Sequence, residues 1–153
     1  MTSVGAATDW LWSLPLIVMS VVIHVVGLMI IFREAVRIMG IAVVRRRFAP
    51  MFIVVMGMVA LHATVLHGLE GTLWAASYRL PDAIPDGKSA MLYSLSAMTS
   101  YGHANLFLKP RWQLTGALEA LNGMLLFGLT TAFLFAMIQR VWPLGHREER
   151  RDS

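Results

Sequence analysis

The stretch KSAMLYSLSAMTSYGH, at residues 88–103, decides how this chain folds. It is amphipathic and too short to cross a bilayer, for which a helix needs about 20 largely apolar residues. Long apolar segments precede and follow it, and it closes on a Tyr101-Gly102 turn. This layout predicts a half-length helix and loop that enter the membrane and return. Irregular backbone at that depth is tolerated only where protein buries it or a water-filled path runs beside it.

The composition is that of an integral membrane protein. Of the 153 residues, 57% are hydrophobic and 14% are charged, against about 45–50% and about 25% in ordinary soluble domains. The chain has no cysteine, which excludes disulfides, c-type haem attachment and thiolate metal sites. Its excess of basic residues lies beside apolar segments, as the positive-inside rule requires, so no nucleic-acid partner is expected.

Three segments are long and apolar enough to span the membrane: residues 11–32, residues 48–78, and a third from residue 110 or 112 to residue 142. The first contains no charge and, as a helix of about 33 Å, exceeds a hydrocarbon core of about 30 Å. The sequence therefore predicts an all-α membrane protein with three transmembrane helices, a re-entrant pore helix and a loop. The chain is expected to divide into a first helix with a basic linker (1–47), a pore domain (48–143) and a short tail (144–153).

The arginines predict the orientation of these spans. Arg33, Arg37 and Arg45 to Arg47 fill the first connection, and further arginines lie in the tail. Both regions are expected in the cytoplasm, which puts the N-terminus and the loop over residues 79–110 outside. Trp10, Trp12, Trp74 and Trp112 then fall near the outer boundary, where an aromatic belt is expected.

Three stretches together resemble the bacterial two-transmembrane, pore-loop potassium-channel-like family. They are HGLEGTLWAASY at 67–78, TSYGH at 99–103 and WQLTGALEALNGMLLFGLTTAFLFAMIQRVW at 112–142. The resemblance covers about residues 60–143 and leaves the first span as an additional helix. It implies a homotetramer in the bacterial plasma membrane, with four loops around a central axis. In such a pore, backbone carbonyls replace the water shell of a K⁺ ion, which passes passively and without catalysis.

The resemblance implies that the ion-conducting filter consists of Thr99, Ser100, Tyr101, Gly102 and His103. The family's pattern is Thr-Val-Gly-Tyr-Gly, often followed by Asp. Aligned on Tyr101-Gly102, this chain has Ser100 at the first glycine, Met98 at the threonine and His103 at the aspartate. A residue other than glycine in a left-handed conformation costs about 1–2 kcal/mol, and Met98 supplies no hydroxyl ligand. Potassium selectivity is therefore open, and Na⁺ is a second candidate ion.

Several polar and small residues of the spans are candidates for supporting roles. Glu70, Glu119 and Asn122 could hold the filter from behind, because carboxylates at membrane depth normally face the bundle interior with a partner. The alternative is helix–helix hydrogen bonding unrelated to conduction, or an interfacial position for Glu70. Gly123 and Gly128 could form a gate hinge, or could permit close helix packing.

Histidines raise a different class of function. His24, His62 and His67 could belong to a haem or metal site, but one His-x-x-Glu is half of what a di-iron bundle needs. Packed, hydrogen-bonded histidines are the simpler interpretation, so no cofactor is expected. The runner-up to a channel is a non-conducting structural or interaction protein that retains the pore-loop fold, and a membrane redox enzyme is a distant third. Lipids and further copies of the chain are the expected partners.

Overall fold

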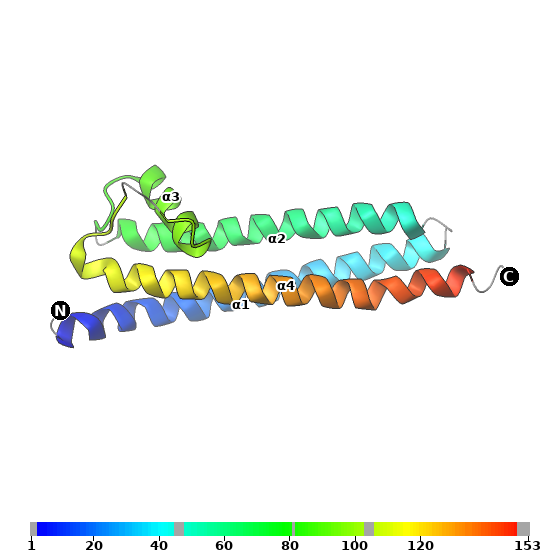
Figure 1. The fold of residues 1–153 in the computed structure, drawn as a ribbon, viewed down its shortest axis with the longest axis horizontal. Coiled ribbons are helices and arrows are strands. Elements are labelled where there is room, and N and C mark those ends of the chain that lie inside the picture. The colour runs from blue at the N-terminus through cyan, green and yellow to red at the C-terminus, as the bar shows by residue number, and fades with distance from the viewer. Residues whose placement is uncertain (1–2, 45–47, 81, 103–105, 150–153) are drawn as a thin grey trace. The chain divides into compact units, whose positions relative to one another are not determined.

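The computed structural model describes residues 3–44, 48–80, 82–102 and 106–149. In these ranges the regular structure is helical (Figure 1): α1 is Ser3–Val44, α2 is Phe48–Arg79, α3 is Gly87–Met98 and α4 is Gln113–Glu149. A single 3₁₀ turn, Pro110–Trp112, leads into α4. Three stretches are long and apolar enough to cross a membrane: Ala7–Ala42, Ala49–Arg79 and Pro110–Val141. The expectation of an all-α chain with three candidate spans and a short helix between two of them is confirmed.

The first helix is longer than the span of residues 11–32 that the sequence predicted. It continues from residue 32 through the arginine-containing segment to Val44, and the apolar stretch itself continues to Ala42. Within that segment Arg37 Nη1 lies 3.8 Å from Glu34 Oε2, one turn earlier, and both side chains are exposed. The second helix begins where the sequence predicted and ends one residue later. Pro50 lies in its first turn, where a proline removes no helical hydrogen bond.

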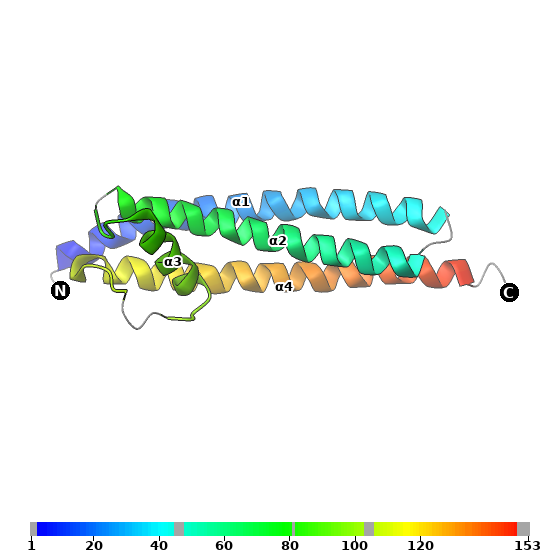
Figure 2. The ribbon, with the colours of Figure 1, turned by 90° about the horizontal axis from the view of Figure 1, so that it is seen from above.

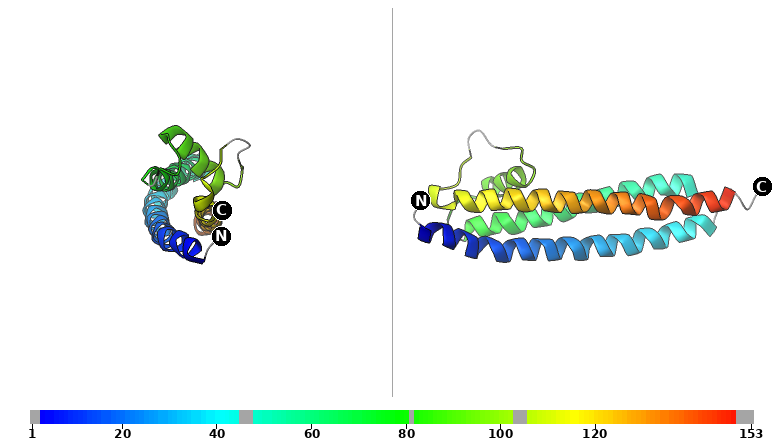
Figure 3. Two further views of the ribbon diagram at one scale, coloured as in Figure 1. Left: turned by 90° about the vertical axis from the view of Figure 1, so that its left-hand side faces the viewer. Right: turned by 60° about the horizontal axis from the view of Figure 1, so that its bottom comes forward.

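The chain forms two compact units. Unit 1 comprises Met1–His24 and His67–Phe127, and unit 2 comprises Val25–Leu66 and Gly128–Ser153. Each of the three long helices contributes one part to each unit. Figure 3 shows the three long helices as continuous ribbons, and their bounds include residues 24–25, 66–67 and 127–128.

Unit 1 contains α3, which lies beside the C-terminal part of α2 and the N-terminal part of α4 (Figure 2). Its apolar core includes Trp74, Tyr78, Ala90, Met98 and Leu126. Of the four tryptophans expected at the outer boundary, Trp74 and Trp112 are buried in this core, whereas Trp10 and Trp12 are exposed. Residues of α3 and of the loops beside it contribute to the core that buries Trp74 and Trp112, and the position of the four tryptophans at the outer boundary stays a prediction.

Unit 2 is held by apolar contacts among its parts of α1, α2 and α4. Its core is formed by Ala35, Met39, Val55, Val59 and Met137, with further small and branched side chains around them. Phe32 and Phe133 meet edge to face with ring centroids 6.4 Å apart. A Cβ at Gly27 would lie 2.7 Å from Leu66 Cδ2, so this glycine lets α1 approach α2 closely.

Candidate functional site

The N-terminal end of α3 is fixed by a side-chain cap. Asp86 precedes the helix in extended conformation, and its carboxylate accepts a hydrogen bond from the Ser89 N–H at 2.8 Å. Aspartate is among the preferred residues at this position, because it satisfies an amide that the helix leaves unpaired. The hydrogen bonds from Ser89 hold the pKa of the Asp86 carboxyl below its usual value. Asp86 is therefore the N-cap of α3.

At its C-terminal end α3 closes in a Schellman motif. The Ser100 N–H donates to the Ala97 carbonyl at 3.1 Å, and the Tyr101 N–H donates to the Ser96 carbonyl at 3.0 Å. These paired bonds require a left-handed residue after the cap, a position that glycine usually occupies. Here it is Ser100, with φ of +56°.

The segment beyond this cap carries the predicted filter. Gly102 is also left-handed, with φ of +74°, and a Cβ there would meet no atom within 4 Å. Tyr101 between them is 84% exposed. Thr99 is the cap residue itself, and its hydroxyl donates to the Leu95 carbonyl at 2.7 Å. His103 lies outside the described residues.

Glu119 of α4 connects α2 to α3. Its carboxylate is fully buried and accepts hydrogen bonds from Tyr78 Oη of α2, at 2.6 Å, and from Ser94 Oγ of α3. Ser94 Oγ is also 2.9 Å from the Gly71 carbonyl oxygen of α2. The single Ser94 hydroxyl hydrogen therefore has two acceptors within reach, one on α4 and one on α2. Through these contacts Glu119 holds the middle of α3 in unit 1.

Two further glycines allow α4 to approach α3. A Cβ at Gly123 would overlap the backbone of Met98, including its carbonyl oxygen, so α4 touches the last turn of α3 at this point. A Cβ at Gly116 would overlap Tyr93 Oη. Burial beside Glu119 raises the pKa of Tyr93 to about 12, so the phenol stays neutral at ordinary pH.

Gly128, the other proposed hinge residue, has open space at its Cβ position, and α4 is helical through both Gly123 and Gly128.

Asn122 and Glu70 contact α1 rather than α3. The Asn122 amide donates to Ser20 Oγ at 2.8 Å, and both residues are buried. Glu70 Oε1 is 2.8 Å from His24 Nδ1 of α1, and its Oε2 is 3.2 Å from His67 Nδ1 of α2. Glu70 and His24 are fully buried, and the His67 side chain is 21% exposed. Of the three residues proposed to support the filter, only Glu119 bonds to α3.

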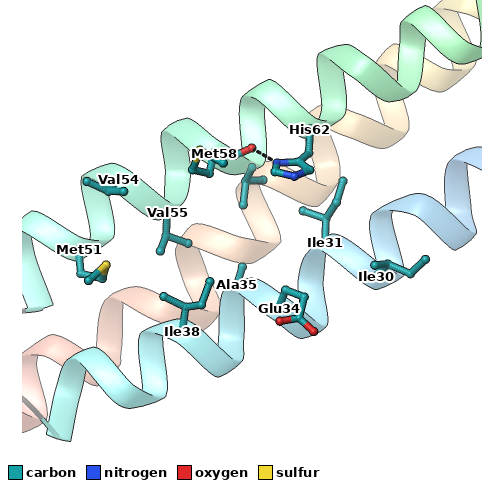
Figure 4. Close-up of a pocket in the computed structure, with 11 residues that line it drawn as sticks. Ile30, Ile31, Glu34, Ala35, Ile38, Met51, Val54, Val55, Met58 and His62 are labelled. Atoms are coloured by element: carbon teal, nitrogen blue, oxygen red, sulfur yellow. Dashed lines mark hydrogen bonds between the residues drawn. The ribbon is translucent and has the colours of Figure 1, made fainter.

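Unit 2 contains a hollow of a different character. A cavity of about 410 Å³ lies between α1 and α2, lined almost entirely by aliphatic side chains and Met51 and Met58 (Figure 4). The polar residues at its edge are Glu34 and His62, and His62 Nδ1 is 2.7 Å from the Met58 carbonyl oxygen. Because few polar atoms line this cavity, it suits contact with an apolar group and lacks the converging polar groups of a catalytic site.

Sequence reasoning missed several residues of these networks. Tyr78, Ser94 and Ser20 were not assigned partners, because hydrogen bonds between residues 25 to 102 positions apart have no local signal. His24 and Glu70 were both noticed, but nothing in their spacing joined them. The available signal was the type of residue: each is polar within an otherwise apolar span, and such residues normally pair with one another.

The three candidate spans indicate a multi-pass helical membrane protein. Comparison with protein-family models, with curated proteins and with solved structures finds no match to this chain.

Proposed function

We propose that this chain is a potassium-channel-like cation channel, in which four copies surround a central pore and ions pass down their gradient. The loop that follows α3, residues 99–103, is the proposed filter. One chain contributes one such loop, so a pore on an axis needs several copies, and closed cyclic symmetry is the usual solution.

The observation that carries the proposal is how firmly α3 is held while its C-terminal segment stays exposed. Asp86 caps its start, Glu119 binds Ser94 in its middle, and Gly123 meets its last turn. Beyond that turn Tyr101 is 84% exposed. A helix anchored along its length and ending in an accessible loop suits a re-entrant filter better than a plain connection between spans.

The backbone of the loop adds support. Ser100 and Gly102 both have positive φ, and they stand at the two glycine positions of the family pattern. Alternating left-handed residues turn successive carbonyls toward one side, which is the arrangement that coordinates a dehydrated cation. The C-terminal end of α3 carries partial negative charge, which also favours a cation beside it.

The residue before the loop, Met98, predicts weak discrimination between K⁺ and Na⁺. Met98 stands where the family has threonine, and its side chain is buried in the core of unit 1. It therefore supplies no ligand, and the site has fewer coordinating oxygens than the family pattern. Selectivity depends on the number and field of such ligands.

The second candidate is a non-conducting membrane protein with the same fold. One observation favours it: the Ser96 and Ala97 carbonyls are used within the Schellman motif, as in an ordinary helix end. In that case residues 99–103 form an outer connection whose role is structural or in binding a partner.

The proposed setting is the bacterial plasma membrane, with the N-terminus outside and the arginine-rich segment and tail in the cytoplasm. Because the chain has no cysteine, single cysteines at Ser3 and Ser153 report on the two sides without background. An impermeant thiol reagent should label Ser3→Cys and spare Ser153→Cys in intact cells. The reverse pattern would overturn the orientation.

The functional test is ion flux from liposomes that contain the purified protein, first under a K⁺ gradient and then under a Na⁺ gradient. Gly102→Ala strains only the backbone of the loop, since its Cβ meets no atom, and should reduce flux. Gly87→Ala, equally open at the start of α3, is the matched control and should conduct as wild type. Native mass spectrometry should find a tetramer. A tetramer without flux of either ion would favour the non-conducting candidate.

A further inference from the structure

We infer that His24, His67 and Glu70 form a binding site for a transition-metal ion of the Zn²⁺ type, inside unit 1. The site joins α1 to α2, and one donor atom from each of the three residues lies within 4.8 Å of the other two. The inference concerns metal binding alone and stands whether or not the protein conducts ions.

The geometry of Glu70 points to a cation between the histidines. Its two oxygens face two different imidazoles, Oε1 at 2.8 Å from His24 Nδ1 and Oε2 at 3.2 Å from His67 Nδ1. Oε2 is buried, and its contact with His67 is an ion pair that lacks the alignment of a hydrogen bond. A carboxylate within a membrane span is costly unless it is paired. A divalent cation would satisfy this carboxylate and both rings at once.

The donor set selects the kind of ion. Two imidazole nitrogens and one carboxylate oxygen suit Zn²⁺, Co²⁺ or Fe²⁺, whereas Mg²⁺ and Ca²⁺ prefer oxygen ligands throughout. A tetrahedral Zn²⁺ with bonds of about 2.0–2.1 Å holds its ligands about 3.3 Å apart. The separations of 2.8 Å and 3.2 Å are near that value, and the third, between the two histidine nitrogens, is no more than 4.8 Å. Three protein ligands leave the fourth position for water.

The position of this site gives it a structural consequence. Glu70 precedes Gly71, whose carbonyl oxygen is 2.9 Å from Ser94 Oγ of α3. His67 also stacks on Phe127 of α4, with ring centroids 6.0 Å apart. A metal ion that fixes His24, His67 and Glu70 therefore steadies the part of α2 to which α3 is bound.

The test is metal binding by the purified chain in mild detergent, with any affinity tag removed. After treatment with a chelator, Zn²⁺ titrated against a chromophoric competitor should bind tightly, and Co²⁺ should give the visible absorption bands of a tetrahedral nitrogen–oxygen site. Glu70→Gln and His67→Gln should each weaken Zn²⁺ binding more than tenfold, since even loss of an outer partner costs about 10- to 100-fold. His62 is an exposed histidine of the same helix, so His62→Gln is the matched control and should bind as wild type.

Circular dichroism separates loss of the site from loss of the fold. If Glu70→Gln fails to fold, the wild-type Co²⁺ spectrum and the His67→Gln variant still decide the matter. A wild-type protein that binds neither ion would overturn the inference. So would Zn²⁺ binding that survives both Glu70→Gln and His67→Gln, because the ion would then lie elsewhere in the chain.

Discussion

The two units are built from the same three long helices but have opposite interiors. Of the residues that the structure describes, all the buried polar and charged side chains belong to unit 1. They include His24, Glu70, Ser94, Glu119 and Asn122. In unit 2 the described buried side chains are aliphatic residues, alanines and methionines.

This difference follows from what each unit has to hold. Apolar side chains pack wherever volume allows, so unit 2 joins three helices without fixing particular atoms to one another. A buried hydrogen bond, in contrast, demands its partner at one distance and angle. Unit 1 must hold a short helix of 12 residues that cannot span a membrane. The comparison teaches that the buried polar contacts lie in the unit that has to fix the position of α3.

The largest effect is expected from removing the carboxylate of Glu119. Glu119→Ala leaves Tyr78 Oη without its acceptor and opens a cavity, which should lower the free energy of unfolding by about 3 kcal/mol. Combining Glu119→Leu with Tyr78→Phe gives unit 1 the apolar chemistry of unit 2. Because Tyr78 and Glu119 are replaced together and Ser94 keeps the Gly71 carbonyl as its acceptor, the loss in that double variant should stay below about 1 kcal/mol. Equal losses in both proteins, by chemical unfolding in detergent, would contradict this account of the polar core.

Two glycines of α4, one in each unit, sharpen the comparison next. Gly123→Ala drives a methyl group into the Met98 backbone, and overpacking of this kind costs about 1–3 kcal/mol. Gly128→Ala meets no atom and should stabilise the helix by about 0.5–1 kcal/mol. Thermal unfolding of the two variants measures the contrast. If Gly123→Ala were as harmless as Gly128→Ala, the close approach of α3 to α4 would be wrong.

Two substitutions that restore the family pattern should have opposite effects. Ser100→Gly relieves a left-handed serine and should raise the free energy of unfolding by about 1 kcal/mol. Met98→Thr empties part of the core of unit 1 and should lower it by about 1–3 kcal/mol. Reversal potentials in mixed K⁺ and Na⁺ solutions should show a gain in K⁺ preference from Ser100→Gly alone. A wild type that already strongly prefers K⁺, unchanged by either substitution, would contradict the expected weak selectivity.

The smallest effect concerns the cap of α3 and depends on pH. The pKa of Asp86 is lowered in the folded chain from an ordinary value of 3.8. The stabilisation by this carboxylate is therefore complete above 3.8 and is lost as pH falls through the lower folded value. Hydrogen exchange at the Ser89 amide should become faster in wild type than in Asp86→Asn as pH drops below 3.8, because asparagine caps without titrating. Parallel profiles for the two proteins would exclude this role for Asp86.

Much of the fold could be predicted from the sequence because membrane spans have a strong local signal. Long, largely apolar runs predicted the three long helices. The extension of α1 to Val44 was missed because arginines seemed to mark the end of the span. The apolar span continues past these charged residues to Ala42, so a few charges within an apolar segment do not mark the end of a helix.

The candidate site was less predictable because its contacts join distant parts of the chain. Glu119 was singled out as a carboxylate at membrane depth, but its partner Tyr78 lies 41 positions away. Glu70 was expected beside the filter and instead bonds to His24, 46 positions away. Packing alone decides which buried polar groups meet, and a single sequence carries no record of packing.

The central claim is that cations pass beside the exposed end of α3 in unit 1, and a chain without cysteine allows a direct test. Tyr101→Cys puts a thiol at the proposed pore mouth, and Lys88→Cys puts one at the other end of α3, where the side chain is also exposed. Both variants are reconstituted in liposomes, treated with a positively charged thiol reagent and assayed for K⁺ flux, with mass spectrometry to verify complete modification. The account predicts that modification blocks flux through Tyr101→Cys and leaves Lys88→Cys unaffected. Full modification at residue 101 with undiminished flux would contradict it.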